Sequence, residues 1–178
     1  MKNTGIARRV DNLGRIVLPK EIRSRLRIHE DDLLEIYIDD GKVVLMKLSP
    51  LEELSELRHM LNGFWNTLKC PIMVCDREKM ILFVHPPIEM QEDISITPEL
   101  ADLIENRKAV VYTGESELIQ PIEDVLYHAL VVQPIVTAGC DLYGAVVLLS
   151  AKSTQQADER MTLGSKMMAD AIAEYLNS

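Results

Sequence analysis

The sequence predicts an α+β protein with two domains, a small β-rich domain at the N-terminus and a larger α+β domain behind it, joined by a helix. The length of 178 residues suits two small domains. Short strand patterns fill residues 1–48, whereas residues 70–178 contain longer apolar strand patterns and a final helix. The charge also changes between them. Ten basic and eight acidic residues give 1–48 a net charge of +2, whereas nine basic and twenty acidic residues give the remainder −11. We therefore place domains at 1–48 and 70–178, with a linker helix over 49–69.

The N-terminal domain is expected to contain four short strands. The first two cover residues 4–10 and 15–18, and they are separated by a turn at 11–14 in which asparagine and glycine can adopt a positive φ. The other two cover residues 34–38 and 42–48, and the Asp-Gly pair between them is a hairpin signal.

One short helix is expected over residues 20–27, with Pro19 near its first position and with Ile22 and Leu26 facing inward. A domain of about 48 residues buries little apolar surface, and a metal, a disulfide or a partner is often needed at that size. The sequence offers no metal-ligand cluster and no disulfide framework here. We therefore expect this domain to form a homodimer.

The segment 49–69 has the signals of a long helix. Ser49 is expected to be the N-cap, with Pro50 at the first helical position and Glu52 completing a capping box. Apolar residues then follow at spacings of three and four, as in a short heptad seam: Leu54, Leu57, Leu61, Phe64 and Leu68. Either this seam pairs copies of the chain and couples the two domains, or it packs on its own domain.

The larger domain alternates strands and helices. Strands are expected over 71–76, 80–84, 109–112, 126–135 and 142–149, and helices over 98–106 and 157–176. The second strand should end at His85. The final helix should carry four residues on its inner side: Met161, Met168, Ile172 and Tyr175.

Basic residues gather at the N-terminus. Residues 1–27 contain eight of them against two acidic residues: Lys2, Arg8, Arg9, Arg15, Lys20, Arg23, Arg25 and Arg27. Lys20, Arg23 and Arg27 fall on one face of the expected helix. Arginine donors suit phosphate oxygens and guanine edges, so this pattern points to nucleic acid. The alternative is a solvated charged face, with Glu21 and Arg25 as an i,i+4 pair.

The run from Thr4 to Arg23, with its central Leu-Gly-Arg-Ile-Val-Leu-Pro-Lys-Glu-Ile-Arg, closely resembles the opening of AbrB-type transition-state regulators. The resemblance continues to about Leu48. It implies a swapped-hairpin β dimer in which Arg8, Arg15 and Arg23 contact double-stranded DNA. Many relatives have a second arginine after the one matched by Arg23, where this chain has Ser24.

Residues 70–178 resemble a GAF domain, through the segments 132–135 and 143–149 and the final helix. AbrB-type regulators with such a C-terminal domain are implied to be homotetramers whose GAF-like domains meet through terminal helices. They are further implied to activate or repress sporulation-type genes, and to sense an unknown small molecule or to assemble through this domain.

No enzyme motif stands out, and no cofactor is expected. The four histidines lack zinc-ligand spacing, and the chain lacks a membrane-spanning run and a signal peptide, so we expect a cytoplasmic, nucleoid-associated protein. Two alternatives remain. One is an antitoxin-like DNA-binding protein that holds a toxin, although the apolar second half should fold alone. The other is a thiol-dependent GAF-like reductase using Cys70, Cys75 and Cys140, whose cysteines otherwise behave as small hydrophobes.

Overall fold

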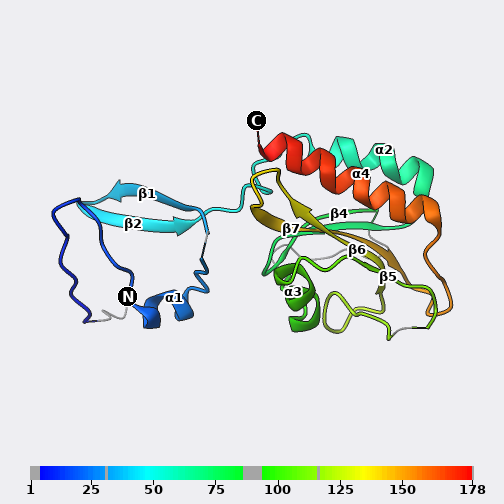
Figure 1. Ribbon diagram of the computed structural model, residues 1–178, viewed down its shortest axis with the longest axis horizontal. Helices are drawn as coiled ribbons and strands as arrows, with labels where there is room; N and C mark the ends of the chain where they lie inside the picture. Colours follow the sequence, from blue (N-terminus) through cyan, green and yellow to red (C-terminus); the bar gives the residue numbers. More distant parts are fainter. Residues whose placement is uncertain (1–4, 31, 86–93, 116, 178) are drawn as a thin grey trace. The chain divides into compact units, whose positions relative to one another are not determined.

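In a computed structural model of the chain, residues 5–30, 32–85, 94–115 and 117–177 are described (Figure 1). The chain divides into two compact units, an N-terminal unit of Met1–Leu48 and a C-terminal unit of Ser49–Ser178. Helix α2 therefore groups with the second unit instead of forming a separate linker. No described helix is both long and apolar enough to cross a membrane.

The N-terminal unit contains one helix and one hairpin. Helix α1 spans Lys20–Arg25, and strands β1 (Leu34–Asp39) and β2 (Lys42–Lys47) pair antiparallel. Asp40 and Gly41 connect the strands with φ angles of 46° and 71°, as the tight hairpin turn requires. The predicted hairpin is confirmed.

The two strands predicted at 4–10 and 15–18 are not formed. The described residues 5–10 and 15–18 have no regular secondary structure. Among the described residues of the chain no strand pairs with these segments, and a strand is stable only where its main chain can pair.

Helix α1 is also shorter and less buried than predicted. It ends at Arg25, and Arg27 beyond it has a left-handed φ of 50°. Ile22 is half-buried, but Leu26, expected to face inward, is 54% exposed. The unit provides no apolar layer for this side chain to enter.

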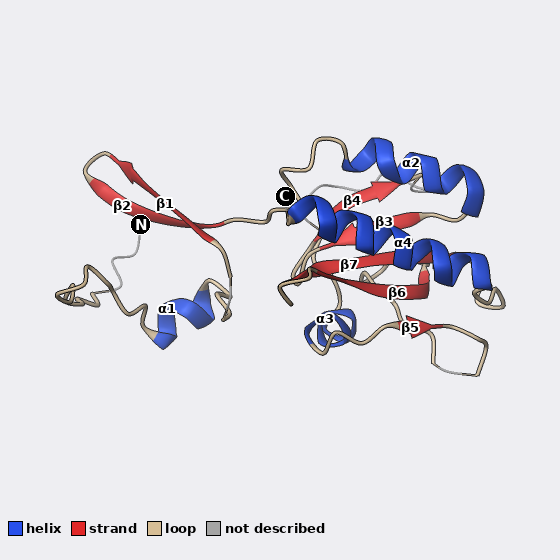
Figure 2. Ribbon diagram, turned by 45° about the horizontal axis from the view of Figure 1, so that its top comes forward, coloured by secondary structure: helices blue, strands red, loops and turns tan. Residues whose placement is uncertain are grey.

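The C-terminal unit is a five-stranded antiparallel sheet with helices on both faces. Its strands are β3 (Ile72–Cys75), β4 (Met80–Val84), β5 (Val110–Val111), β6 (His128–Val136) and β7 (Leu142–Ser150), in the order β4-β3-β7-β6-β5. Helices α2 (Leu57–Leu68) and α4 (Glu159–Leu176) lie side by side on one face, and α3 (Pro98–Glu105) lies on the other (Figure 2). The described strands and helices α3 and α4 match their predicted places closely, although β5 is shorter.

Two apolar cores follow from the alternation of side chains along the strands. On β3, Ile72 and Val74 belong to the core beneath α2 and α4, whereas Met73 and Cys75 belong to the core on the α3 side. All four side chains are fully buried. The central strands therefore read as continuous apolar runs because both faces of the sheet are covered.

Helix α2 begins at Leu57, not at Pro50 as predicted. Ser49 and Glu52 do not form a capping box. The main chain turns instead, with the Glu52 N–H donating to the Ser49 carbonyl, and the Glu52 carboxylate pairs with Lys79 at 2.8 Å. The Glu52 side chain is therefore used in an ion pair instead of a helix cap, and Leu51 in the same turn is buried.

The predicted seam packs on its own unit. Leu57, Leu61 and Leu68 are buried in the core beneath α2 and α4, and Leu54 and Phe64 pack against that core while partly exposed. Burial of these three residues favours the alternative in which the seam packs on its own unit, and a role of the seam in pairing copies or coupling the domains stays a prediction.

Helix α4 starts at the N-cap Asp158, whose carboxylate accepts from the Met161 N–H. Met161, Met168 and Ile172 are buried as predicted, whereas Tyr175 is 56% exposed.

Candidate nucleic-acid interface

Every described basic residue of the segment 5–27 is exposed, and the segment supplies them from four local structures. Arg8 and Arg9 lie on irregular chain, Arg15 closes a turn, Lys20, Arg23 and Arg25 lie on α1, and Arg27 follows the helix. Lys2 lies outside the described residues. Seven cations and two carboxylates therefore share this surface segment.

The turn of residues 11–15, here called the Asp11 turn, is held by one side chain. Asp11 Oδ1 accepts from the Leu13 and Arg15 main-chain N–H groups at 2.9 and 2.8 Å, and Asp11 Oδ2 accepts from Arg15 Nε at 2.8 Å. Main-chain hydrogen bonds close the same turn, from Gly14 N to Asp11 O and from Asp11 N to Arg15 O. Gly14 has a φ of 79°, which favours glycine.

The Asp11 carboxylate is ionised in this setting. The Arg15 main-chain hydrogen bond is the largest cause that lowers its pKa, and the Arg15 side chain is the next. The guanidinium nevertheless stays open to solvent, since the Arg15 side chain is 70% exposed. The sequence predicts this turn but not its ion pair, whose only signal is the i,i+4 spacing of an acid and an arginine across Gly14.

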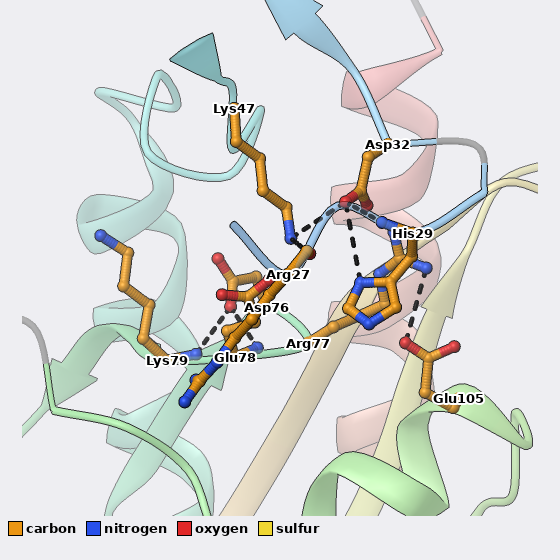
Figure 3. A network of polar contacts seen from close by, with 9 residues as sticks. All are labelled: Arg27, His29, Asp32, Lys47, Asp76, Arg77, Glu78, Lys79 and Glu105. Carbon is orange, nitrogen blue, oxygen red and sulfur yellow. Dashed lines mark hydrogen bonds and ion pairs between the residues drawn. The ribbon is translucent and has the colours of Figure 1, made fainter. Parts of the chain in front are cut away.

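The predicted row of three cations on one helix face is reduced to two. Lys20 and Arg23 are one turn apart on α1, but Arg27 lies past the helix end. Its carbonyl instead accepts from Lys47 Nζ at 3.1 Å, and the same ammonium pairs with the buried carboxylate of Asp32 at 3.1 Å (Figure 3). Lys47 thereby ties the end of β2 to the chain that follows α1.

The N-terminal unit has almost no interior of its own. Pro19 is its only buried residue among those described. The exposed large apolar residues of the unit come from the irregular segments, α1 and the hairpin: Ile6, Val10, Leu13, Ile16, Val17, Leu26, Leu33, Ile36, Tyr37, Ile38, Val43, Leu45 and Met46. Ile38 and Val17 are 81% and 77% exposed. An exposed apolar area of this extent is typical of an interaction surface.

Two of the three cysteines of the C-terminal unit are shielded from solvent. Cys70 and Cys75 are buried, and burial raises the pKa of Cys70 to about 11 and that of Cys75 further. Cys140 is exposed on the β6–β7 hairpin, and none of the three forms a disulfide. A buried thiol with a raised pKa holds very little thiolate at neutral pH.

Two polar side chains that follow β3 hold neighbouring segments of this unit together. Asp76 Oδ1 accepts from two main-chain N–H groups of the β3–β4 turn, and Arg77 reaches Glu105 on α3 (Figure 3). Trp65 stacks on His85 with ring centroids 3.7 Å apart. Among the described residues, no three His, Cys, Asp or Glu side chains gather to hold a metal.

Helix α4 carries an exposed apolar row, here called the α4 ridge: Leu163, Met167, Ala171 and Tyr175. The three larger side chains are 61%, 53% and 56% exposed. Their spacing of four places them along one ridge of the helix, and the ridge runs from the exposed side at Leu163 towards the edge of the buried face at Tyr175.

Comparison with known proteins finds a matching family model for each of the two units. Residues 53–177 match the family model of the stage V sporulation protein T C-terminal domain, described as a transcription factor, and residues 7–52 match that of the MazE bacterial antitoxin, described as antidote-toxin recognition. The chain is 37% identical to stage V sporulation protein T of Bacillus subtilis (strain 168) over 158 residues, covering 86% of this chain and 88% of that protein.

The N-terminal unit has a second relative. The transition state regulatory protein AbrB of the same organism is 58% identical over 50 residues, which cover 28% of this chain and about half, 52%, of that protein. A solved structure of a red/green cyanobacteriochrome in its red light-absorbing state is similar over 70% of this chain and 99% of that one, with a TM-score of 0.44 and 16% identity.

A basic, exposed N-terminal unit of AbrB type followed by an α/β domain defines a transcription factor of the AbrB class. Within that class, the chain belongs to the family of stage V sporulation protein T.

Proposed function

We propose that this protein is a DNA-binding regulator of sporulation-type transcription that binds double-stranded DNA through the N-terminal units of an oligomer. The observation that carries the proposal is the exposed segment 5–27, in which seven cations surround a chain that buries almost nothing. Three of these cations are proposed as the principal DNA contacts, namely Arg8, Arg15 and Arg23. Arg9, Lys20, Arg25, Arg27 and Lys2 are proposed to add phosphate contacts.

A second copy is proposed to cover the apolar surface of the N-terminal unit. Strand pairing between copies would supply the partners that residues 5–10 and 15–18 lack within one chain, and it would bury side chains such as Val17 and Ile38. Pairing also doubles the number of cations on one face. A doubled set suits DNA, because affinity rises with each phosphate that a cation neutralises.

The C-terminal unit is proposed to assemble pairs of dimers into a tetramer through the α4 ridge. An exposed row of Leu163, Met167 and Tyr175 favours helix packing between copies, because burial of each such side chain contributes about 1.5–3 kcal/mol. The same GAF-like unit is the proposed receiver of a small-molecule signal.

The antitoxin alternative has one specific observation in its favour, the match of residues 7–52 to the MazE model. Antitoxin tails of this kind are expected to be disordered before they wrap a toxin. Residues 49–177 instead hold two apolar cores on either side of a sheet. A folded second unit favours the regulator over a toxin-binding partner. We propose that the regulator acts in the cytoplasm, associated with the nucleoid, and that it is not an enzyme.

The direct test is binding of the full-length protein to labelled A·T-rich DNA duplexes. The wild type should bind at low salt, and a variant with Arg8, Arg15 and Arg23 all changed to alanine should bind at least about a hundredfold more weakly. Circular dichroism should show the same secondary structure for both proteins. Equal binding by the two would remove DNA contact from this segment.

A further inference from the structure

We propose that Asp11 is a positioning residue for DNA binding, because it fixes the Arg15 guanidinium so that the terminal nitrogens of Arg15 face a backbone phosphate. This inference rests on the proposed function. The negative charge of Asp11 repels DNA phosphates. Any favourable effect of Asp11 on DNA binding must therefore act through Arg15.

The geometry gives the Asp11 carboxylate two tasks. Oδ1 binds the main chain of the turn through Leu13 and Arg15, and Oδ2 binds the side chain of Arg15 at Nε. One carboxylate thus sets both the backbone from which Arg15 projects and the direction of its guanidinium. Each hydrogen bond is between 2.8 and 2.9 Å long, within the range of charge-assisted bonds.

The ion pair leaves the phosphate-binding edge of Arg15 open. Only Nε donates to Asp11, and no described residue pairs with the two terminal nitrogens. These nitrogens carry the donors that bind a phosphate in bidentate fashion. A guanidinium already held at Nε loses less rotamer freedom on binding than a free arginine side chain does.

Charge and positioning predict opposite signs for the loss of Asp11. Removing a carboxylate from a DNA-binding surface reduces repulsion and should tighten binding. Loss of the hydrogen bonds should release Arg15 and weaken binding by about tenfold, since ordering a long side chain opposes the contact. The sign of the change therefore decides between the two effects.

Glu21 provides a matched control. It is the other acidic residue of the basic segment, it lies exposed in the first turn of α1, and no described residue forms an ion pair with it. Glu21→Ala removes the same charge from the same segment without releasing an arginine. It should leave DNA affinity unchanged or raise it by about two- to threefold.

The experiment measures the dissociation constant of the full-length protein for a fluorescein-labelled A·T-rich duplex at about 50 to 200 mM salt. Four proteins are compared with the wild type: Asp11→Ala, Glu21→Ala, Arg15→Ala and the double variant with Asp11→Ala and Arg15→Ala. We expect Asp11→Ala to weaken binding about tenfold and Glu21→Ala not to weaken it.

The double variant separates positioning from a purely structural role. If Asp11 acts through Arg15, adding Asp11→Ala to Arg15→Ala should cause no further loss, and relief of repulsion should even restore a little affinity. A further tenfold loss in the Arg15→Ala background would mean that Asp11 only maintains the fold of the turn. That result, or tighter binding by the single Asp11→Ala variant, would overturn the inference while the proposed function stands.

Two further arms keep the test decisive. If circular dichroism shows that Asp11→Ala does not fold, Asp11→Asn replaces it in the same comparison, since an amide oxygen still accepts the main-chain bonds but no longer carries the charge that holds Arg15. If the wild type itself does not bind the duplex at low salt, the proposed function fails and this inference fails with it.

Discussion

Gly144 on β7 occupies a position that has no room for a side chain. Its φ is 152°, and a Cβ atom built there would lie 1.9 Å from the Cys75 carbonyl oxygen on the neighbouring strand β3. The close approach of the two main chains therefore depends on the missing side chain.

Gly144→Ala is accordingly expected to destabilise the C-terminal unit by about 2–4 kcal/mol. Gly63→Ala is the control, because Gly63 lies exposed in the interior of α2, where an added Cβ would meet no atom within 4 Å. That change should stabilise by about 0.5–1 kcal/mol. Thermal unfolding followed by circular dichroism measures both. Equal unfolding temperatures for the two variants would refute the packing account.

His128 is a second residue with a defined energetic role. It is buried at the start of β6, its ring edge faces Tyr112, and its Nε2 has no hydrogen-bond partner among the described residues. Burial lowers its pKa from 6.5, against a smaller opposing effect of a hydrogen bond to the Gln155 main chain. The folded protein therefore disfavours the protonated ring.

The sign of the pH dependence follows from that direction. Well above the unfolded pKa of 6.5 the ring is neutral in the folded and unfolded states, and it contributes nothing to the pH dependence. As the pH falls, the unfolded chain takes up the proton first, so stability is lost. The loss of melting temperature between about pH 7.5 and pH 5.5 should be larger in the wild type than in His128→Gln. The same loss in both proteins would show that other groups cause it.

At the scale of elements, helix α2 belongs to the core and not to a flexible connection. Leu61 is fully buried among the residues beneath α2 and α4. A proline at this position would consequently disrupt the C-terminal unit itself, and it would not selectively uncouple the two units.

Leu61→Ala should therefore destabilise the C-terminal unit by about 2–5 kcal/mol. Asn66→Ala, on the exposed side of the same helix, should change stability by less than about 0.5 kcal/mol. Urea unfolding of the full-length proteins gives both values. A cost for Leu61→Ala no larger than that for Asn66→Ala would mean that α2 does not support the core.

The elements that could be predicted from the sequence are those whose partners lie in the same chain. The β1–β2 hairpin, the sheet of the C-terminal unit and helices α3 and α4 follow from local turn signals and apolar alternation. The start of α2 could not be predicted, because residues 49–56 make contacts distant in sequence, with Leu51 buried in the core and Glu52 paired with Lys79.

The candidate site is predictable in composition but not in geometry. Charge and the AbrB-type run both point to the arginines of residues 5–27, and these arginines are exposed. The strands expected to carry Arg8 and Arg15 are not formed over the described residues 5–10 and 15–18. The proposed role of Asp11 cannot be predicted from a charge count, because by its negative charge alone Asp11 would only weaken DNA binding.

At the scale of the whole molecule, the two units differ in what they leave exposed. The N-terminal unit exposes apolar strands and cations, and the C-terminal unit exposes an apolar ridge on α4. We propose that both surfaces contact further copies of the chain, and the first also carries the cluster of cations that suits DNA.

The assembly prediction concerns the α4 ridge. Changing Leu163 and Met167 together to glutamate should reduce the oligomer in light scattering from four chains to two, because the N-terminal units would still pair. Lys166→Ala with Asp170→Ala removes an exposed ion pair of the same helix and leaves the ridge intact, so it should keep the wild-type mass. An unchanged mass in the glutamate variant would exclude the ridge as an interface.

The most direct test of the central claim compares two variants that lose the same positive charge in different units. In one, Arg8, Arg15 and Arg23 become alanine; in the other, the exposed Arg58, Lys108 and Lys152 of the C-terminal unit do. The slope of log K for DNA against log salt should flatten by about 0.9 for each phosphate that is no longer neutralised, and only in the first variant. Equal slopes in the two variants would contradict the account, because the salt dependence of DNA binding would then reflect the total charge of the protein and not the cations of its N-terminal unit.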